Sequence, residues 1–338
     1  MDDRTQVRKQ YLAASPWAHH RCDFLAGDAS NRKYWRLNDK KTGGTVVLMD
    51  APGDPNDALL PFVDRTNYLE QIGLAPPKIF AQNTGDGFLV IEDLGDRIFA
   101  RFLETDPTAE TALYTAAVDV LIHLYHAPRP AGVGTYDPEL MADLGDLARS
   151  WYSFGCDGPT DQPFKAELES VLSGTWSEKM VFVQRDYHAE NLLWNPDEKA
   201  PKNVGLLDYQ DGLLGHPAYD LVSLLEDARR DVSPTIKETM LDHYISKTDQ
   251  DPATFKAAFA SQGAQRNLRI LGVFARLSMH YGKPHYVDLI PRVWDHLQND
   301  LSHPSLTKLR KICDDTLPPP TPKNLQKLRD KCATIPHP

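Results

Sequence analysis

The fold is decided by Val181-Phe-Val-Gln-Arg-Asp-Tyr-His-Ala-Glu-Asn-Leu-Leu-Trp194 together with Val204-Gly-Leu-Leu-Asp-Tyr-Gln-Asp211. In the first segment Asp186 follows an apolar run and Asn191 comes five residues later, and in the second Asp208 ends another apolar run. Phosphoryl transfer needs one carboxylate to accept the proton of the attacking hydroxyl. It also needs an amide and a second carboxylate to hold Mg²⁺ against the nucleotide phosphates. The pattern predicts a kinase with Asp186 as catalytic base and Asn191 and Asp208 as metal ligands.

A predicted hairpin joins the two metal ligands. Short apolar runs at 192–194 and 204–207 flank a turn-rich segment, and the run at 180–183 suits a buried strand. A hairpin would bring Asn191 and Asp208 together at one end, as a shared metal requires. The alternative is that these polar residues only make turns or caps, which Asp and Asn favour.

Composition indicates a globular enzyme rather than a nucleic-acid-binding or membrane protein. The 338 residues suffice for two lobes, and the net charge of −10 is spread along the chain, so basic nucleic-acid patches are not expected. No apolar run approaches membrane-spanning length, and the first ten residues lack the apolar stretch of a secretion signal. The four cysteines are far apart, which favours free thiols in a reducing cytoplasm. We expect a cytoplasmic protein with a small-molecule substrate as its partner; the sequence does not indicate its oligomeric state.

The order of predicted elements indicates an α+β fold with two lobes. Residues 1–94 form the predicted nucleotide-binding lobe, a small antiparallel sheet with one helix. Its candidate strands lie at 34–37, 45–49 and 88–91, and its helix at 61–72. Residues 95–338 form a larger, mainly helical lobe for catalysis and substrate binding. Its candidate helices lie at 109–126, 140–154, 164–172, 219–229, 233–245, 265–280, 287–301 and 324–332.

The phosphates of a nucleotide are expected near the turn at 25–34. Its small residues let backbone N–H groups approach phosphate oxygens, although neither the P-loop nor the dinucleotide-binding glycine pattern is present. Ser30 and Asn31 lie in this turn. Arg32 and Arg36 follow on one face of the predicted strand. An ordinary solvated basic strand is the alternative.

The motifs described above resemble those of aminoglycoside phosphotransferases and choline kinases, and they occur in order along the chain. These families have a bilobal protein-kinase-like fold. Six segments are similar to one branch, the anomeric N-acetylmuramate/N-acetylglucosamine kinases of bacterial peptidoglycan recycling. They are Gly27-Asp-Ala-Ser-Asn-Arg-Lys-Tyr34, Leu48-Met-Asp-Ala-Pro52, Gly87-Phe-Leu-Val-Ile-Glu-Asp-Leu-Gly95, Asp208-Tyr-Gln-Asp211, Tyr219-Asp-Leu-Val-Ser-Leu-Leu225 and Leu271-Gly-Val-Phe-Ala-Arg-Leu277. The resemblance extends from about residue 20 to about residue 310.

This resemblance implies ATP and Mg²⁺ as cofactors. It places a hinge whose backbone holds adenine at Glu92, Asp93 and Leu94. Members of the family carry a lysine on the third strand that bridges the α- and β-phosphates, but Val46-Val-Leu-Met-Asp50 has none. We expect another cation, from Arg32 or Arg36, to supply that charge.

The resemblance also implies phosphorylation of the anomeric hydroxyl of N-acetylmuramate or N-acetylglucosamine. His188 either contacts this substrate or supports the catalytic segment. Gln210 and Asp211 could hydrogen-bond sugar hydroxyls, with a turn cap as the alternative for Asp211. Arg266 could pair with a substrate carboxylate, or belong to a solvated basic face. Asp220, at a helix start, is expected to brace the catalytic segment.

Two other functions stay open. One is a kinase for an aminoglycoside, choline or another small alcohol. The other is an inactive nucleotide-binding pseudokinase, which the missing strand lysine motivates.

Overall fold

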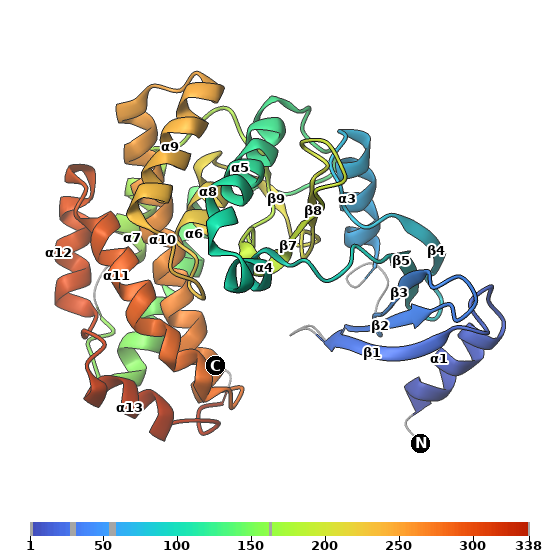
Figure 1. Cartoon of the computed structure of the whole chain (residues 1–338). Helices are drawn as coiled ribbons and strands as arrows, with labels where there is room; N and C mark the ends of the chain where they lie inside the picture. The colour runs from blue at the N-terminus through green and yellow to red at the C-terminus, as the bar shows by residue number, and fades with distance from the viewer. Residues whose placement is uncertain (1–2, 28–31, 54–58, 162–163, 337–338) are drawn as a thin grey trace. The chain divides into compact units, whose positions relative to one another are not determined.

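Five antiparallel strands form one sheet in the order β1-β2-β3-β5-β4 (Figure 1). The computed structural model describes residues 3–27, 32–53, 59–161 and 164–336. The strands of this sheet are β1 (Arg21–Gly27), β2 (Lys33–Asn38), β3 (Thr45–Asp50), β4 (Ile79–Asn83) and β5 (Phe88–Glu92). The predicted strands at 34–37, 45–49 and 88–91 are confirmed as β2, β3 and β5, whereas β1 and β4 were not predicted.

Alternation along the strands gives this sheet two different faces. On one face Leu37, Leu48, Phe88 and Val90 make a small buried core, against which side chains of α1 (Asp3–Ala13) pack. The other face carries the polar and apolar side chains of the pocket described below. The sheet therefore places its nucleotide-facing candidates on the face opposite α1.

Two arginines of helix α1 hold it to the sheet through ion pairs and through contacts with aromatic rings. Arg4 and Arg8 pair with Asp50, at 2.6 and 3.3 Å, and Asp50 is only 1% exposed. The Arg4 guanidinium lies 4.3 Å from the ring centre of Phe88, and that of Arg8 lies 3.6 Å from Trp35. Because these partners are distant in sequence, hydrophobic periodicity alone did not predict this helix.

The chain divides into two compact units, Met1–Val120 with Glu190–Gly212, and Leu121–Ala189 with Leu213–Pro338. This division does not follow the predicted boundary at residues 94 and 95. The reason is that the hairpin after the catalytic segment packs with the first unit: Ala75 bridges to Gly205, and Ile98 to Leu193. The first unit also contains α3 (Leu60–Gln71), α4 (Phe99–Thr105), β7 (Leu192–Trp194) and β8 (Val204–Leu206). Helix α5 (Glu110–His126) contributes to both units.

The second unit is mainly helical around the long helix α10 (Pro252–Met279), whose residues are largely buried. Gly272 on α10 allows a close approach, because a Cβ atom there would collide with the backbone of Leu147. A short antiparallel pair joins β6 (Val181–Val183) to β9 (Leu213–Gly215). The other elements are α6 (Pro138–Gly145), a π-helical segment (Ala148–Ser153), α7 (Phe164–Gly174), α8 (Ala218–Leu225), α9 (Pro234–Thr248), α11 (Ile290–Leu301), α12 (Thr307–Thr316) and α13 (Pro322–Asp330).

A sheet unit followed by a mainly helical unit confirms the predicted α+β fold class. Most predicted helices are present with shifted ends, but α4 and α12 were missed. The predicted helix at 140–154 is instead α6, which ends at Gly145, followed by the π-helical segment. Within the described ranges, no helix combines the length and apolar character needed to cross a bilayer.

Candidate active site

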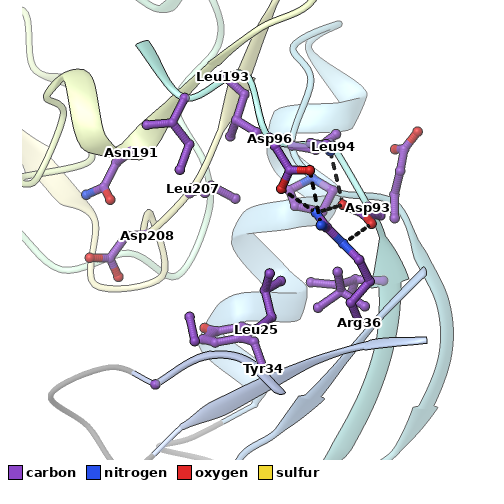
Figure 2. Close-up of a pocket in the computed structure, with 18 of the residues that line it drawn as sticks. Leu25, Tyr34, Arg36, Asp93, Leu94, Asp96, Asn191, Leu193, Leu207 and Asp208 are labelled. Carbon is purple, nitrogen blue, oxygen red and sulfur yellow. Dashed lines mark hydrogen bonds and ion pairs between the residues drawn. The ribbon is translucent and has the colours of Figure 1, made fainter. Parts of the chain in front are cut away.

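The first unit contains a pocket of about 310 Å³ (Figure 2). Its polar edge includes Arg36, Asp93 and Asp96, and Asn191 and Asp208 lie on another side. Aliphatic, aromatic and proline side chains supply the other walls, which suit the flat apolar faces of a purine base. These wall residues include Leu25, Val47, Phe62, Pro77, Ile91, Leu94, Leu193 and Leu207.

The predicted hinge lies on this pocket. Glu92, Asp93 and Leu94 all line it. The Glu92 backbone N–H donates to the Lys78 carbonyl at 2.8 Å, and the Lys78 N–H donates to Glu92 Oε2 at 3.2 Å. The segment is therefore tied to the chain that precedes β4.

Arg36 reaches the same hinge from β2. Its Nε lies 2.7 Å from Asp93 Oδ2, and its Nη2 donates to Asp93 Oδ1 at 3.0 Å. It also donates from Nη1 and Nη2 to Asp96, at 3.1 and 2.8 Å. Burial raises the pKa of Asp93, but hydrogen bonds from Arg36, Thr45 and the Gly95 N–H outweigh burial and hold it below its usual value. Arg36 thus carries a charge that two carboxylates already compensate.

The β7–β8 hairpin positions the two candidate metal ligands. Leu192 pairs with Leu206, and the Leu207 N–H donates to the Asn191 carbonyl at 3.0 Å, so the hairpin brings the ends of both strands together as predicted. Figure 2 shows the Asn191 amide and the Asp208 carboxylate on one side of the pocket. Asp208 adopts φ +57°, a conformation that Asp tolerates better than most residues.

One carboxylate and one amide oxygen form a donor set that fits Mg²⁺, which prefers oxygen ligands and completes its shell with phosphates and water. Asn191 and Asp208 would hold the ion. Gln210 donates from Nε2 to Asp208 Oδ1 at 2.7 Å, so this predicted substrate residue orients the carboxylate in the structure.

Tyr209 anchors this segment to α3. Its ring stacks on Phe62 with centres 5.4 Å apart, and its hydroxyl lies 2.6 Å from that of Thr66. Both residues of this hydrogen bond are fully buried. The neighbouring Asp208 is thereby attached to a packed helix rather than to an open loop.

In the second unit, Asp186 lies in a positively charged environment. Burial by itself raises the pKa of its carboxyl, but nearby positive charge, chiefly that of Arg269, lowers the pKa below its usual value. Arg266 and Arg185 act in the same direction. The carboxylate is therefore ionised at neutral pH, as a proton acceptor must be.

Asp220 braces the backbone just before Asp186, which confirms its expected role. Its two carboxylate oxygens accept hydrogen bonds from the N–H groups of Gln184 at 2.6 Å and Arg185 at 2.9 Å. Arg185 has φ +75°, a left-handed conformation that costs energy for a residue with a long side chain. Asp220 is fully buried, and this burial raises its pKa to about 7.

His188 and Arg266 lie farther from solvent than a substrate contact predicts. His188 is 4% exposed, and burial lowers its pKa to about 4, so its ring is neutral at pH 7. Its Nε2 lies 3.3 Å from Arg229 Nη1. Arg266 is 3% exposed and donates to the Glu226 carbonyl at 3.4 Å. Among these residues, Arg229 is the exposed cation.

The remaining predicted residues have different positions. Ser30 and Asn31 fall outside the described residues, and their predicted role stays a prediction. Arg32 is largely buried and directly precedes β2, and Asp211 is exposed. Sequence reasoning did not assign Asp96 or Arg229 to a site. Asp96 had a weak signal in the Gly95-Asp96 turn after the hinge, whereas nothing local identified Arg229.

Comparisons with known proteins agree with this arrangement. The model of the phosphotransferase enzyme family matches residues 21–257. A relative from Caulobacter vibrioides, named N-acetylmuramate/N-acetylglucosamine kinase, is 34% identical over 94% of this chain and 97% of its own length.

Solved structures share the fold at low sequence identity. A choline/ethanolamine kinase family protein from Mesorhizobium loti has a TM-score of 0.59 and 13% identity, and covers 97% of this chain and 99% of its own. An aminoglycoside phosphotransferase from Streptomyces rimosus, solved with ADP and streptomycin, has a TM-score of 0.53 and 16% identity. It covers 80% of this chain and 99% of its own. These likenesses confirm the predicted kinase-like fold.

Proposed function

Because the chain belongs to the phosphotransferase enzyme family, we propose that it transfers the terminal phosphoryl group of ATP to the anomeric hydroxyl of N-acetylmuramate or N-acetylglucosamine. The observation that carries this proposal is the pocket that Asn191 and Asp208 line together, with Asp186 in the chain segment directly before Asn191. The relative from Caulobacter supports the choice of sugar.

In the proposed reaction, the anomeric oxygen attacks the terminal phosphorus of ATP. The new O–P bond forms as the bond to the bridging oxygen of ADP breaks, and Asp186 takes the proton of the hydroxyl. An anomeric hydroxyl is more acidic than an ordinary alcohol, which suits a carboxylate base. Bound Mg²⁺, held by Asn191 and Asp208, would offset negative charge on the phosphates.

The apolar pocket is the proposed place for the adenine ring. Residues 92–94 line it, and Leu94 and Leu193 contribute to its apolar walls. Its apolar walls suit a base, whereas Asn191 and Asp208 supply polar atoms on another side of it. The phosphates would therefore extend towards Asn191 and Asp208.

Charges near Asp186 favour a neutral or anionic acceptor over a cationic one. Arg269, Arg266 and Arg185 all act on the Asp186 carboxylate, and Arg229 is in contact with His188. Aminoglycosides and choline carry positive charge, which these arginines would repel. N-acetylglucosamine is neutral and N-acetylmuramate carries a carboxylate, so both fit the environment better.

The test uses purified protein with ATP, Mg²⁺ and one acceptor at a time, followed by phosphorus NMR. We expect a sugar-1-phosphate from N-acetylmuramate or N-acetylglucosamine, and no product from kanamycin or choline. Turnover of kanamycin or choline with both sugars inert would overturn the proposal. Binding of ADP without turnover of any acceptor would favour the inactive alternative.

Arg229 offers a sharper test of the anionic acceptor. It is exposed and in contact with His188, so it is the cation we assign to the lactyl carboxylate of N-acetylmuramate. Arg229→Gln should raise the KM for N-acetylmuramate about tenfold, the loss of one charge-assisted hydrogen bond, and leave the KM for N-acetylglucosamine nearly unchanged. Arg230→Gln, one residue along the chain, is the matched control. Equal effects on the KM for both sugars would show that Arg229 does not recognise the carboxylate.

We also propose that the protein acts in the cytoplasm.

A further inference from the structure

Arg36 makes the most extensive ion-pair contact on the pocket wall of the described residues. Four contacts of 2.7 to 3.1 Å connect its guanidinium to Asp93 and Asp96 (Figure 2). In the pairing of β2 with β3, Arg36 lies opposite Val47. The neighbours of Arg36 on the same face of the sheet also line the pocket. The contacts thus connect β2 to the chain that leaves β5, two strands away in the sheet.

Charge balance argues against a direct role of Arg36 at the phosphates. One guanidinium faces two carboxylates, so the group as a whole carries one negative charge. Turning the side chain towards a phosphate would leave Asp93, only 5% exposed, without its cation. The planar fork of arginine is also already used in bidentate contacts with carboxylates, an arrangement that lysine cannot reproduce.

The hinge held by Arg36 is also fixed by its own backbone. Asp93 Oδ1 accepts a second hydrogen bond from the Gly95 N–H at 3.0 Å, and Gly95 has φ +86°, which favours glycine. On its other side, Glu92 is bonded to Lys78. Residues 92–96 are therefore held at both ends, with Arg36 as the only one of these ties that comes from β2 in the described structure.

We propose that Arg36 is a positioning residue for the nucleotide base: through Asp93 and Asp96 it holds residues 92–96 in the conformation that forms the pocket wall. It acts on the base through the hinge and does not contact the phosphates. This inference rests on the proposed function only in taking the ligand of the pocket to be a nucleotide.

The decisive experiment compares a ligand without phosphates to one without a base. Adenosine, ADP and inorganic tripolyphosphate are titrated by calorimetry into the wild type, Arg36→Met and Arg36→Lys. We expect both variants to bind adenosine and ADP about threefold to tenfold more weakly by the same factor, with tripolyphosphate binding unchanged. The KM for ATP should rise accordingly while kcat stays within about twofold.

Arg36→Lys separates geometry from charge. If Arg36 instead supplied positive charge to the phosphates, lysine would restore the affinity for ADP, and adenosine binding would be equal in all variants. That result would overturn the inference. Arg21→Met is the matched control, because it removes an arginine paired with an aspartate on the adjacent strand β1, and it should leave adenosine affinity unchanged.

Asp96→Asn tests the same contact by a second variant, in case the Arg36 variants do not fold. The Asp96 side chain is 71% exposed, so its loss should cost little stability but weaken adenosine binding in the same direction. In Arg36→Met, the further change Asp96→Asn should have almost no effect on adenosine affinity, since its partner is already absent. Additive losses would contradict a shared contact.

Hydrogen exchange gives a readout that needs no ligand. The amides of residues 92–96 should exchange faster in Arg36→Met than in the wild type, and amides of β1 should not change. If the wild type binds neither adenosine nor ADP, the nucleotide role of the pocket fails, but faster exchange still supports the positioning role. Unchanged exchange would overturn it.

Discussion

The pocket of the first unit and the surroundings of Asp186 in the second unit use charge in opposite ways. In the first, Arg36 is paired with Asp93 and Asp96 at the edge, and the walls are apolar. In the second, buried or half-buried arginines act on one carboxylate. The first arrangement leaves apolar walls around the pocket, whereas the second lowers the pKa of the candidate base Asp186.

The carboxylates of the second unit sharpen this contrast. Burial raises the pKa of Asp220 to about 7, while positive charge keeps that of Asp186 below its usual value despite burial. The two residues are close in the structure, because Asp220 accepts a hydrogen bond from the N–H of Arg185, the residue directly before Asp186. Local charge, and not burial alone, therefore separates the pKa of Asp220 from that of the candidate base Asp186.

The largest effect is expected at Asp186. Asp186→Asn keeps the shape but cannot accept the proton, so kcat should fall by about 10²–10⁴. ADP affinity should stay within about twofold, because the residues lining the pocket belong to the first unit. Steady-state kinetics and calorimetry measure both quantities. Asp143→Asn, at an exposed ion pair with Lys165, is the control, and a variant at Asp186 with full kcat would show that the base is misassigned.

The second-largest effect is expected on the stability of Asp220→Asn. In Asp220→Asn the amide nitrogen cannot accept a hydrogen bond, so one of the N–H groups of Gln184 and Arg185 loses its partner. The free energy of unfolding should fall by about 1–3 kcal/mol. Denaturant unfolding measures it, and the exposed Asp242→Asn serves as the control. An equally stable variant would mean that the backbone there does not depend on Asp220.

The difference in stability between the wild type and Asp220→Asn should depend on pH. Asp220 has a pKa of about 7 in the folded state and an ordinary value of 3.8. Between these values the folded state binds more protons than the unfolded state, so the wild type loses stability as pH rises through this window and then levels off. The advantage of the wild type over Asp220→Asn should be largest near pH 4 and smallest above pH 7. An advantage that grows with pH would contradict the raised pKa.

A smaller effect is expected from the charge that acts on Asp186. Arg269→Gln removes positive charge, so the pKa of Asp186 should rise and the acid limb of kcat/KM should move to higher pH. The pH profile of kcat/KM measures this directly. Arg292→Gln, which removes an exposed pair with Asp231, should leave the limb in place. An unmoved limb in Arg269→Gln would assign the low pKa to another cause.

The smallest effect is expected from loss of the hydrogen bond between the Tyr209 and Thr66 hydroxyls in the first unit. Tyr209→Phe removes the contact with Thr66 and should lower the free energy of unfolding by about 1 kcal/mol. The double variant Tyr209→Phe, Thr66→Val should be no less stable than the single one, since neither polar group is then left unpaired. A further loss in the double variant would show that Thr66 has another essential role.

Much of the candidate site could be predicted because its signals are local. Asp186 and Asn191 lie in one segment, and the strand pattern around Asp208 predicted the hairpin that brings Asn191 and Asp208 to one side of the pocket. The partners of Arg36 could not be predicted, because 57 and 60 residues separate it from Asp93 and Asp96. The same holds for α1, whose arginines find Asp50 only in the folded sheet.

The sequence by itself determined the chemical groups, the α+β order of elements and the alternation that puts Tyr34 and Arg36 on the pocket face. Only the tertiary structure decided that Arg36 is neutralised by the hinge and that Arg269 lowers the pKa of Asp186. The reason is physical: hydrogen bonds and ion pairs depend on distance and burial, and neither follows from spacing along the chain.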